Sequence, residues 1–353
     1  MNAIERTLTT IGFRKPDRLP VDLHNFQPAA AMMGLPLQEV FKNGDLIAES
    51  QIKAWREFRH DVLILESGTS SSAEACGVEV VYRDDAAPVA TKPVLERLED
   101  VDKLELLDPW TTFPWSEILK ATQIVAREIG DKAFIIGRGD QGPFSLALML
   151  RGYENFMVDI AMNEQPDLIN KLLDYCRHTA TRFAMAQLEA GAHATSIGES
   201  PSGPDVLSPR HYRKWAFPHQ QQMIAKFTAQ GKLIAHHICG NTVPILDDFI
   251  ATGAQITEID HKTDLTKARD ATNGKTAILG PIDTGLLAFG TPDDVDAACR
   301  EAIAIMRVGK DFHTGFILGP GCALGAKTPA DNIHALVEAA KKYGVNVKGS
   351  CIL

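Results

Sequence analysis

Three residues of this chain have the types and spacing of a metal site that could do chemistry. His237 and Cys239 stand where an apolar stretch, residues 233–238, runs into a Gly-Asn-Thr turn. Side chains two positions apart on a strand share a face, so the imidazole and the thiol are expected to project together. Cys322, far downstream, also stands where an apolar run meets glycine and proline. One imidazole and two thiolates form a familiar zinc set, and three protein ligands leave a coordination position for substrate.

The residues around this set indicate a fourth ligand and a reaction class. Asp260 ends the next predicted strand and is expected to complete the site, with Glu258 and His261 as substitutes. His236 is expected to point to the opposite side of its strand, away from the metal. A zinc site rich in thiolates can hold an incoming thiol deprotonated near neutral pH, which suggests alkyl transfer to or from sulfur. The alternative is a hydrogen-bonded histidine beside two packed thiols, because free cysteine is often buried.

Further polar residues follow other predicted strands. Glu66 and Glu74 could bind polar groups of a substrate. The residues expected to contact a cofactor are Asn241, Gly139, Asp140, Glu199 and Asp283. Each of these also fits a solvated loop or a turn glycine. The sequence contains neither a phosphate-binding glycine motif nor a serine nucleophile elbow.

Eight short apolar segments, nearly all separated by helical patterns, must position these residues. The predicted strands are residues 19–23, 61–66, 133–137, 194–198, 233–238, 255–260, 276–280 and 314–319. The predicted helices include residues 36–58, 115–129, 144–162, 165–190, 209–230, 243–252, 293–308 and 330–343. Repeated βα units imply parallel pairing, and eight of them favour a closed (β/α)₈ TIM barrel over an open sheet. The candidate residues then fall on the face where barrel active sites lie.

Length and composition limit the remaining choices. We predict one TIM-barrel domain over residues 1–353, with an N-terminal helical extension and an excursion at about 73–112 that contains a hairpin. A net charge of −9 argues against nucleic acid or an anionic membrane as partner. The sequence has no 18-residue apolar stretch and no secretion signal at its N-terminus, so a cytoplasmic location is expected. Six dispersed cysteines, Cys351 among them, do not form a disulfide framework.

These motifs resemble those of a known family. The chain is similar to the uroporphyrinogen decarboxylase-like superfamily, specifically its branch of zinc-dependent, corrinoid-linked methyltransferases, which includes the methylcobamide:coenzyme M methyltransferases. The specific part is HICGNT at residues 237–242 together with FILGPGC at 316–322. Scaffold motifs accompany it nearly end to end: RKPDRLPV at 14–21, EACGVE at 74–79, GPFSLA at 142–147, LSPRHY at 207–212 and FGTPDD at 289–294.

The resemblance implies a TIM barrel and a metal site. It implies that His237, Cys239 and Cys322 bind Zn²⁺, and that Asp260 completes the set when substrate is absent. Enzymes of this branch move a methyl group between the cobalt of a cobamide, usually carried by a partner corrinoid protein, and an acceptor or donor on the zinc. A homodimer is consistent with the superfamily.

Two departures from the superfamily pattern affect the substrate. Its decarboxylases carry an arginine-rich segment after the first strand to hold porphyrin carboxylates. This chain has HNFQPA at residues 24–29, without arginine, although Asp22 supplies an acidic residue. Porphyrinogen decarboxylation is therefore not expected. In addition, Pro281 stands where family members often have asparagine, which leaves substrate contacts near Asp283 open.

The expected function is methyl transfer by a zinc site that uses a corrinoid as co-substrate. Coenzyme M, another thiol or a folate are all compatible acceptors, and methoxylated compounds, methylamines or methyl thioethers are compatible donors. A metal-free decarboxylase is the alternative enzyme, and it requires arginines contributed from elsewhere. A non-enzymatic carrier of corrinoid or metal is the third hypothesis. The absence of a cobalamin-binding D-x-H-x-x-G signature argues against a cobamide held by the chain itself.

Overall fold

The computed structural model describes residues 1–308, 311–312 and 314–345, and Cys351 lies outside these ranges. Within them, eight parallel strands form one sheet. In spatial order these strands are β1 (Asp22–Leu23), β2 (Val62–Leu65), β5 (Phe134–Gln141), β6 (Ala194–Gly198), β7 (Leu233–Ile238), β8 (Ile256–Ile259), β9 (Ala277–Ile282) and β12 (Phe316–Pro320). A parallel bridge between Val21 and Leu318 joins the two edges and closes the ring. The predicted TIM barrel is confirmed.

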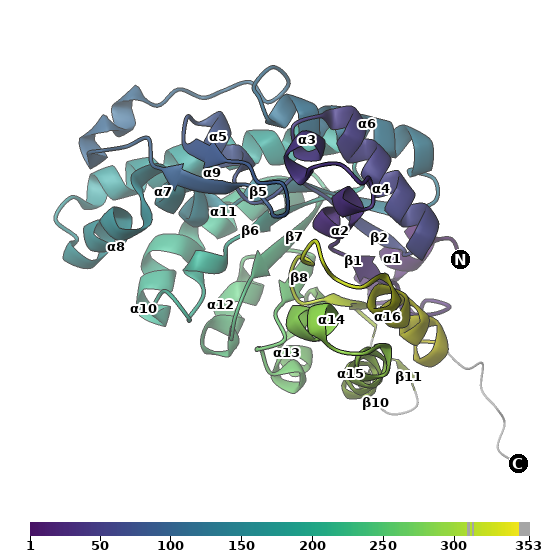
Figure 1. Cartoon of the computed structure of the whole chain (residues 1–353). Coiled ribbons are helices and arrows are strands. Elements are labelled where there is room, and N and C mark those ends of the chain that lie inside the picture. The colour runs from purple at the N-terminus through teal and green to yellow at the C-terminus, as the bar shows by residue number, and fades with distance from the viewer. Residues whose placement is uncertain (309–310, 313, 346–353) are drawn as a thin grey trace, which may run out of the picture.

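Helices surround the strands (Figure 1). They are α1 (Ala3–Ile11), α2 (Phe26–Ala31), α3 (Leu37–Phe41), α4 (Gly44–Phe58), α5 (Ser71–Ala75), α6 (Trp115–Ile129), α7 (Pro143–Arg151), α8 (Tyr153–Met162), α9 (Pro166–Glu189), α10 (Pro209–His211), α11 (Phe217–Thr228), α12 (Leu246–Ala251), α13 (Leu265–Thr272), α14 (Thr284–Phe289), α15 (Pro292–Ile305) and α16 (Ala330–Tyr343). The excursion holds the antiparallel hairpin β3 (Glu79–Val81) and β4 (Val89–Lys92), and a second small pair is β10 (Arg307–Val308) with β11 (Asp311–Phe312). Within the described residues, every helix is too short or too polar to cross a lipid bilayer.

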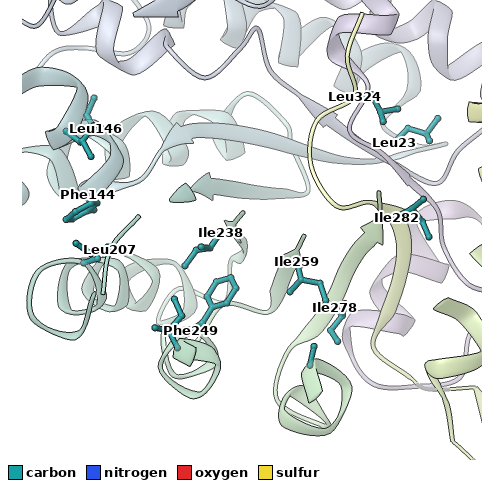
Figure 2. Packing of buried hydrophobic residues seen from close by; sticks show 14 of the residues in the cluster. Leu23, Phe144, Leu146, Leu207, Ile238, Phe249, Ile259, Ile278, Ile282 and Leu324 are labelled. Carbon is teal, nitrogen blue, oxygen red and sulfur yellow. The ribbon is translucent and has the colours of Figure 1, made fainter. Parts of the chain in front are cut away.

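Strand alternation divides the apolar side chains between two cores. Val62 and Ile64 of β2 belong to the cluster inside the barrel, whereas Leu63 and Leu65 pack against the outer helices. The outer core continues around the barrel, and Figure 2 shows Ile238, at the end of β7, beside Phe249 of α12. Apolar side chains therefore fill the part of the barrel interior nearer the amino ends of the strands. The next inward-facing positions, toward the carboxyl ends, are left for polar groups.

Several predicted bounds were wrong for identifiable reasons. β5 continues through Gln141, so Gly139 and Asp140 lie in the strand and not in a loop after it. The register shifts between Arg138 and Gln141, and Asp140 has a φ of 61°, which marks a bulge that breaks the simple strand pattern. β1 is shorter than predicted because Pro20, inside the predicted strand, has no N–H to donate.

Three predicted helices are interrupted. The segment 36–58 divides into α3 and α4, where the Asn43 side chain accepts from the N–H groups of Asp45 and Leu46 and starts a new helix. The segment 144–162 breaks at Gly152, whose φ of 86° ends α7. A π-helical turn, Tyr212–Ala216, separates α10 from α11.

A cluster of ion pairs lies at the amino ends of the strands. It explains part of the RKPDRLPV motif. The buried Asp61 carboxylate accepts from Arg6 Nη1 at 2.7 Å, from Arg18 Nη1 at 2.6 Å and from the Val21 N–H at 3.0 Å. It thereby joins the N-terminal helix and the first strand to the start of β2. This motif is a structural anchor.

We expect Asp61→Asn to lower the free energy of unfolding by about 1.5–3 kcal/mol, because Arg18 loses its carboxylate partner while Arg6 keeps its pair with Asp17 at 2.7 Å. Urea denaturation followed by circular dichroism measures this loss. The matched surface control is Glu57→Gln, whose exposed pair with His334 spans 3.1 Å and should contribute about 0–1 kcal/mol. Equal losses in the two variants would contradict the anchor role.

His60 predicts a pH dependence of stability. Its side chain is buried without a hydrogen-bond partner for either ring nitrogen, and burial lowers its pKa from 6.5 to about 3. The imidazole is neutral in the folded protein but gains a proton on unfolding below pH 6.5, so stability is complete above that pH. Between pH 6 and 4 it should fall by about 1.4 kcal/mol per pH unit from this residue. His60→Leu should reduce the slope of unfolding free energy against pH by that amount, as measured by urea denaturation at a series of pH values. An unchanged slope would show that His60 is not the source of the pH dependence.

Candidate metal centre

The structure brings the three predicted zinc ligands together at the mouth of the barrel. The distance from His237 Nε2 to Cys239 Sγ is 2.9 Å, and the two Sγ atoms of Cys239 and Cys322 are 3.6 Å apart. The three ligand atoms all lie within 4.8 Å of one another. Both thiols are half-buried, so the group is closed on one side and open to solvent on the other.

Close backbone approach lets Cys322 reach residues at the end of β7. β12 and β7 are separated by β8 and β9 in the sheet. The loop after β12 therefore crosses over the end of β8, and a Cβ at Gly321 would come within 2.9 Å of the His261 backbone nitrogen. The Gly321 N–H also donates to the Ile282 carbonyl at 2.7 Å. Only glycine fits at this crossing, which explains why glycine precedes the distant cysteine.

The Asp260 carboxylate fixes the loop that carries Cys239. One oxygen accepts from the Gly240 N–H at 2.9 Å, and the other accepts from the Lys262 N–H at 3.1 Å. His261 Nδ1 lies 2.8 Å from that second oxygen. Asp260 is not in the close group formed by the three ligands. Its role as fourth ligand stays a prediction, and its contacts show a loop-holding role that the sequence did not indicate.

The two thiols of the centre differ in acidity. The hydrogen bond with Cys322 and the charge of His237 lower the pKa of Cys239. The same hydrogen bond, together with burial, raises the pKa of Cys322, because two thiolates so close would repel each other. Burial disfavours a charged His237, but Glu258 and Cys239 outweigh it and raise the pKa of His237 to about 9. A bound metal ion would have to displace these protons.

Ser200 is a contact that the sequence did not suggest. It lies in the 3₁₀ turn after β6, and its hydroxyl donates to Cys239 Sγ at 3.0 Å. The other described cysteines, Cys76, Cys176 and Cys299, are buried. Burial raises the pKa of Cys299 to about 12. Their burial is typical of structural thiols and separates them from the pair at the barrel mouth.

Four buried charged side chains lie beneath the thiols, and we call them the charge ring: Glu66, His24, Glu258 and Arg138. His24 Nε2 lies 2.9 Å from Glu66 Oε1, and His24 Nδ1 lies 3.2 Å from Glu258 Oε1. Arg138 Nε is 3.3 Å from Glu66 Oε2, and Arg138 Nη1 is 3.5 Å from Glu258 Oε2. Each carboxylate thus stands between the same two cations, and the four charges sum to zero.

The charge ring was only partly visible in the sequence. Glu66 was expected to bind substrate, and Glu258 was considered as a ligand. The predicted third strand ends at residue 137 and leaves out Arg138, although alternation through Phe134 and Ile136 places this side chain inward. Although burial disfavours charge, Glu66 and Glu258 raise the pKa of His24 to about 10.

The remaining predicted residues have local structural contacts. Glu199 accepts from the Phe144 and Ser145 N–H groups at 3.0 and 2.8 Å and so caps α7, and burial raises its pKa to about 7. Asp140 accepts from the Ser72 N–H at 2.6 Å, and its second carboxylate oxygen is buried without a hydrogen-bond partner. A Cβ at Gly139 would meet Ala184 at 2.6 Å, so this glycine faces α9 and not the interior.

Asn241, Asp283 and Glu74 also make local hydrogen bonds, in a turn, at a helix start and in the excursion. The Asn241 side-chain Oδ1 accepts from the Val243 N–H at 3.1 Å. Asp283 caps α14 by accepting from the Gly285 N–H at 2.8 Å. Glu74 accepts from the Tyr82 hydroxyl at 2.6 Å, within the excursion. His236, as predicted, turns outward, where its ring meets Phe249 of α12 with 4.8 Å between centroids.

Comparisons with known proteins agree with this architecture. The methylcobamide:CoM methyltransferase MtbA of Methanosarcina mazei is 31% identical over 260 residues, which cover 72% of each chain. The uroporphyrinogen decarboxylase of Crocosphaera subtropica is 26% identical over 311 residues, which cover 86% of this chain and 84% of that one. A solved methyltransferase structure from Methanosarcina mazei matches with a TM-score of 0.88 and 23% identity over 97% of this chain and 99% of that one, and it supports the fold.

A family model matches nearly the whole chain. The model described as uroporphyrinogen decarboxylase (URO-D) covers residues 2–343. This span includes every strand of the barrel and all three thiol and imidazole groups of the centre. The chain therefore belongs to the uroporphyrinogen decarboxylase (URO-D) family.

Proposed function

We propose that this chain is a zinc-dependent methyltransferase that moves a methyl group between a corrinoid and a thiol or a methylated small molecule. The observation that carries the proposal is the convergence of His237, Cys239 and Cys322 within 4.8 Å at the barrel mouth. The similarity to a methylcobamide:CoM methyltransferase supports the same reaction class.

The donor set fits the metal. One imidazole and two thiols are soft to borderline ligands that suit Zn²⁺ better than Mg²⁺ or Ca²⁺. Zn²⁺ in such a set supplies the Lewis acidity that keeps an incoming thiol deprotonated near neutral pH. The chain contributes the orientation: Asp260 holds the Cys239 loop through Gly240, and the Ser200 hydroxyl donates to Cys239 Sγ. The half-buried thiols leave an approach from solvent.

The methyl group and its carrier meet the site at the carboxyl ends of the strands. Because the chain lacks the D-x-H-x-x-G signature, we propose that a partner corrinoid protein brings the cobamide to this face. The donor or acceptor is a small molecule that occupies the open side of the thiol pair. A homodimer stays a prediction.

The metal-free decarboxylase is the alternative, and the charge ring argues against it. A tetrapyrrole acid requires cations that are free to pair with its carboxylates. Arg138, which the barrel contributes near the mouth, is already paired with Glu66 and Glu258. The segment after β1, residues 24–29, contains no arginine. These residues therefore favour the methyltransferase.

Metal analysis is the first test. Purified wild-type protein should contain about one zinc per chain, and Cys239→Ala or Cys322→Ala should weaken zinc binding by at least about tenfold because each removes a ligand. Cys299→Ala is the matched control: it removes a buried cysteine of α15 and should keep the zinc. If wild-type protein contained no zinc and took none up after reconstitution, the methyltransferase proposal would fail and the decarboxylase would replace it.

Methyl transfer is tested with the zinc-loaded protein, methylcobalamin and a panel of thiols. We expect thiol-dependent loss of methyl-Co(III) absorbance and formation of the thioether, detected by mass spectrometry. Cys322→Ala should reduce the rate to the uncatalysed background, because its site no longer orients the thiol. Wild-type rates equal to that background with every thiol, and with the reverse reaction from methylated donors, would contradict the proposal.

A further inference from the structure

Glu258 stands where the charge ring meets the metal centre. Its backbone carbonyl lies 3.3 Å from His237 Nδ1, and its carboxylate Oε1 lies 3.6 Å from the same nitrogen. The same Oε1 is 3.2 Å from His24 Nδ1. Glu258 is fully buried. One side chain therefore contacts a predicted metal ligand and the ring beneath it.

The two nitrogens of His237 face different neighbours. Nε2 points to Cys239 Sγ at 2.9 Å, on the side of the thiols. Nδ1 faces Glu258: the backbone carbonyl, 3.3 Å away, can only accept a hydrogen bond, and the carboxylate Oε1, 3.6 Å away, attracts the ring N–H by its charge. This arrangement places the ring proton on Nδ1 and leaves the Nε2 lone pair for an ion. A carboxylate behind a metal-binding histidine is a recurrent way to fix its orientation.

The ring explains how a buried carboxylate is kept in this place. An isolated carboxylate in the barrel interior would be costly to bury. Here Glu258 lies against His24 and Arg138, and both cations also contact Glu66. All four side chains are at most 3% exposed. The pairs hold Glu258 from two directions, so its carboxylate cannot turn away from His237 without losing them.

We propose that Glu258 is a positioning residue for the metal centre, which fixes His237 with Nε2 toward the thiols, and that His24, Arg138 and Glu66 hold Glu258 in place for this task. The inference rests on the proposed function for the presence of the metal, but it is independent of the methyl donor and acceptor. It assigns a role to four residues that do not themselves contact the thiols.

The decisive experiment compares zinc affinity by competition with a chromophoric chelator at one fixed pH. Glu258→Gln keeps the shape of the side chain but removes its charge, and we expect zinc affinity to fall about 10–100-fold. Long-range ¹⁵N–¹H spectra of histidine-labelled, zinc-loaded protein report the tautomer directly. Wild-type His237 should carry its proton on Nδ1, and the variant should show a changed or exchange-broadened His237 signal.

Glu199→Gln is the matched control. Glu199 is equally buried, and its backbone N–H donates to the His237 carbonyl at 2.8 Å, but its carboxylate caps α7 by accepting from the Phe144 and Ser145 N–H groups. The substitution changes only this carboxylate. Its variant should lower the melting temperature while zinc affinity and the His237 signal stay as in wild type. A loss of zinc affinity equal to that of Glu258→Gln would mean that any buried glutamate has this effect, and it would overturn the inference.

His24→Gln tests the ring and keeps the proposal testable if Glu258→Gln does not fold. It leaves the Glu258 carboxylate in the protein but removes one of its two cationic neighbours. We expect weaker zinc binding, in the same direction and smaller than for Glu258→Gln. Unchanged zinc affinity in His24→Gln would overturn the part assigned to the ring.

The outcomes separate this inference from the proposed function. If wild-type protein binds about one zinc per chain and folded Glu258→Gln binds it as tightly, with the same His237 tautomer, the positioning role is refuted while the zinc site stands. If wild-type protein binds no zinc, the proposed function itself fails.

Discussion

The pairing of buried charges across the barrel interior is the interaction on which the site depends. An apolar layer formed by side chains such as Phe134, Ile136 and Ile256 fills the lower part of the barrel. Above it, the strands end in carboxylates, an imidazole and a guanidinium that could not be buried singly without a large desolvation cost. The alternating order of these charges lets each one face two of opposite sign. This charged layer contacts the metal centre through Glu258 and His237, so charge as well as packing holds the centre in place.

Two kinds of constraint converge on the same few atoms. The backbone constraint is the crossing at Gly321, where a side chain would collide with the end of β8. The polar constraint is Asp260, which joins the loops after β7 and β8 through Gly240 and Lys262. Neither group is a thiol or an imidazole, yet both determine where Cys239 and Cys322 lie. Residues that contribute no thiol or imidazole therefore determine part of the geometry of the centre.

The sequence was most informative where one periodicity dominated. β6, β7 and α16 have the predicted bounds because uninterrupted apolar runs or helical spacing mark them. The same runs, repeated eight times, predicted the barrel and hence the meeting of His237 with Cys322. Prediction was weaker where local structure depends on contacts between distant segments. The bulge in β5 is not marked by spacing, and it moved Gly139 and Asp140 from a loop into a strand.

Individual polar residues were the hardest to interpret. Glu199 is predicted to contact a cofactor because it follows a strand, but its carboxylate accepts from the first N–H groups of α7, a helix more than fifty positions earlier. Ser200 lies beside it in a polar turn, and nothing in the spacing separates the two. A strand-end position limits where a side chain lies, but its partners come from other strands and loops. Only the three-dimensional arrangement decides which polar residue supports the fold and which faces the thiols.

The closure of the barrel has a mechanical consequence. β1 is two residues long, and a single bridge between Val21 and Leu318 joins it to β12. The junction between β1 and β12 is thus a place where the strands of the barrel share little backbone pairing. The ion pair between His24 and Glu258 joins the end of β1 to β8 across the barrel interior, and it stabilises the closed barrel from inside. The charge ring therefore attaches β1 to β2 and β8 through side chains at the place where the backbone pairing with β12 is shortest.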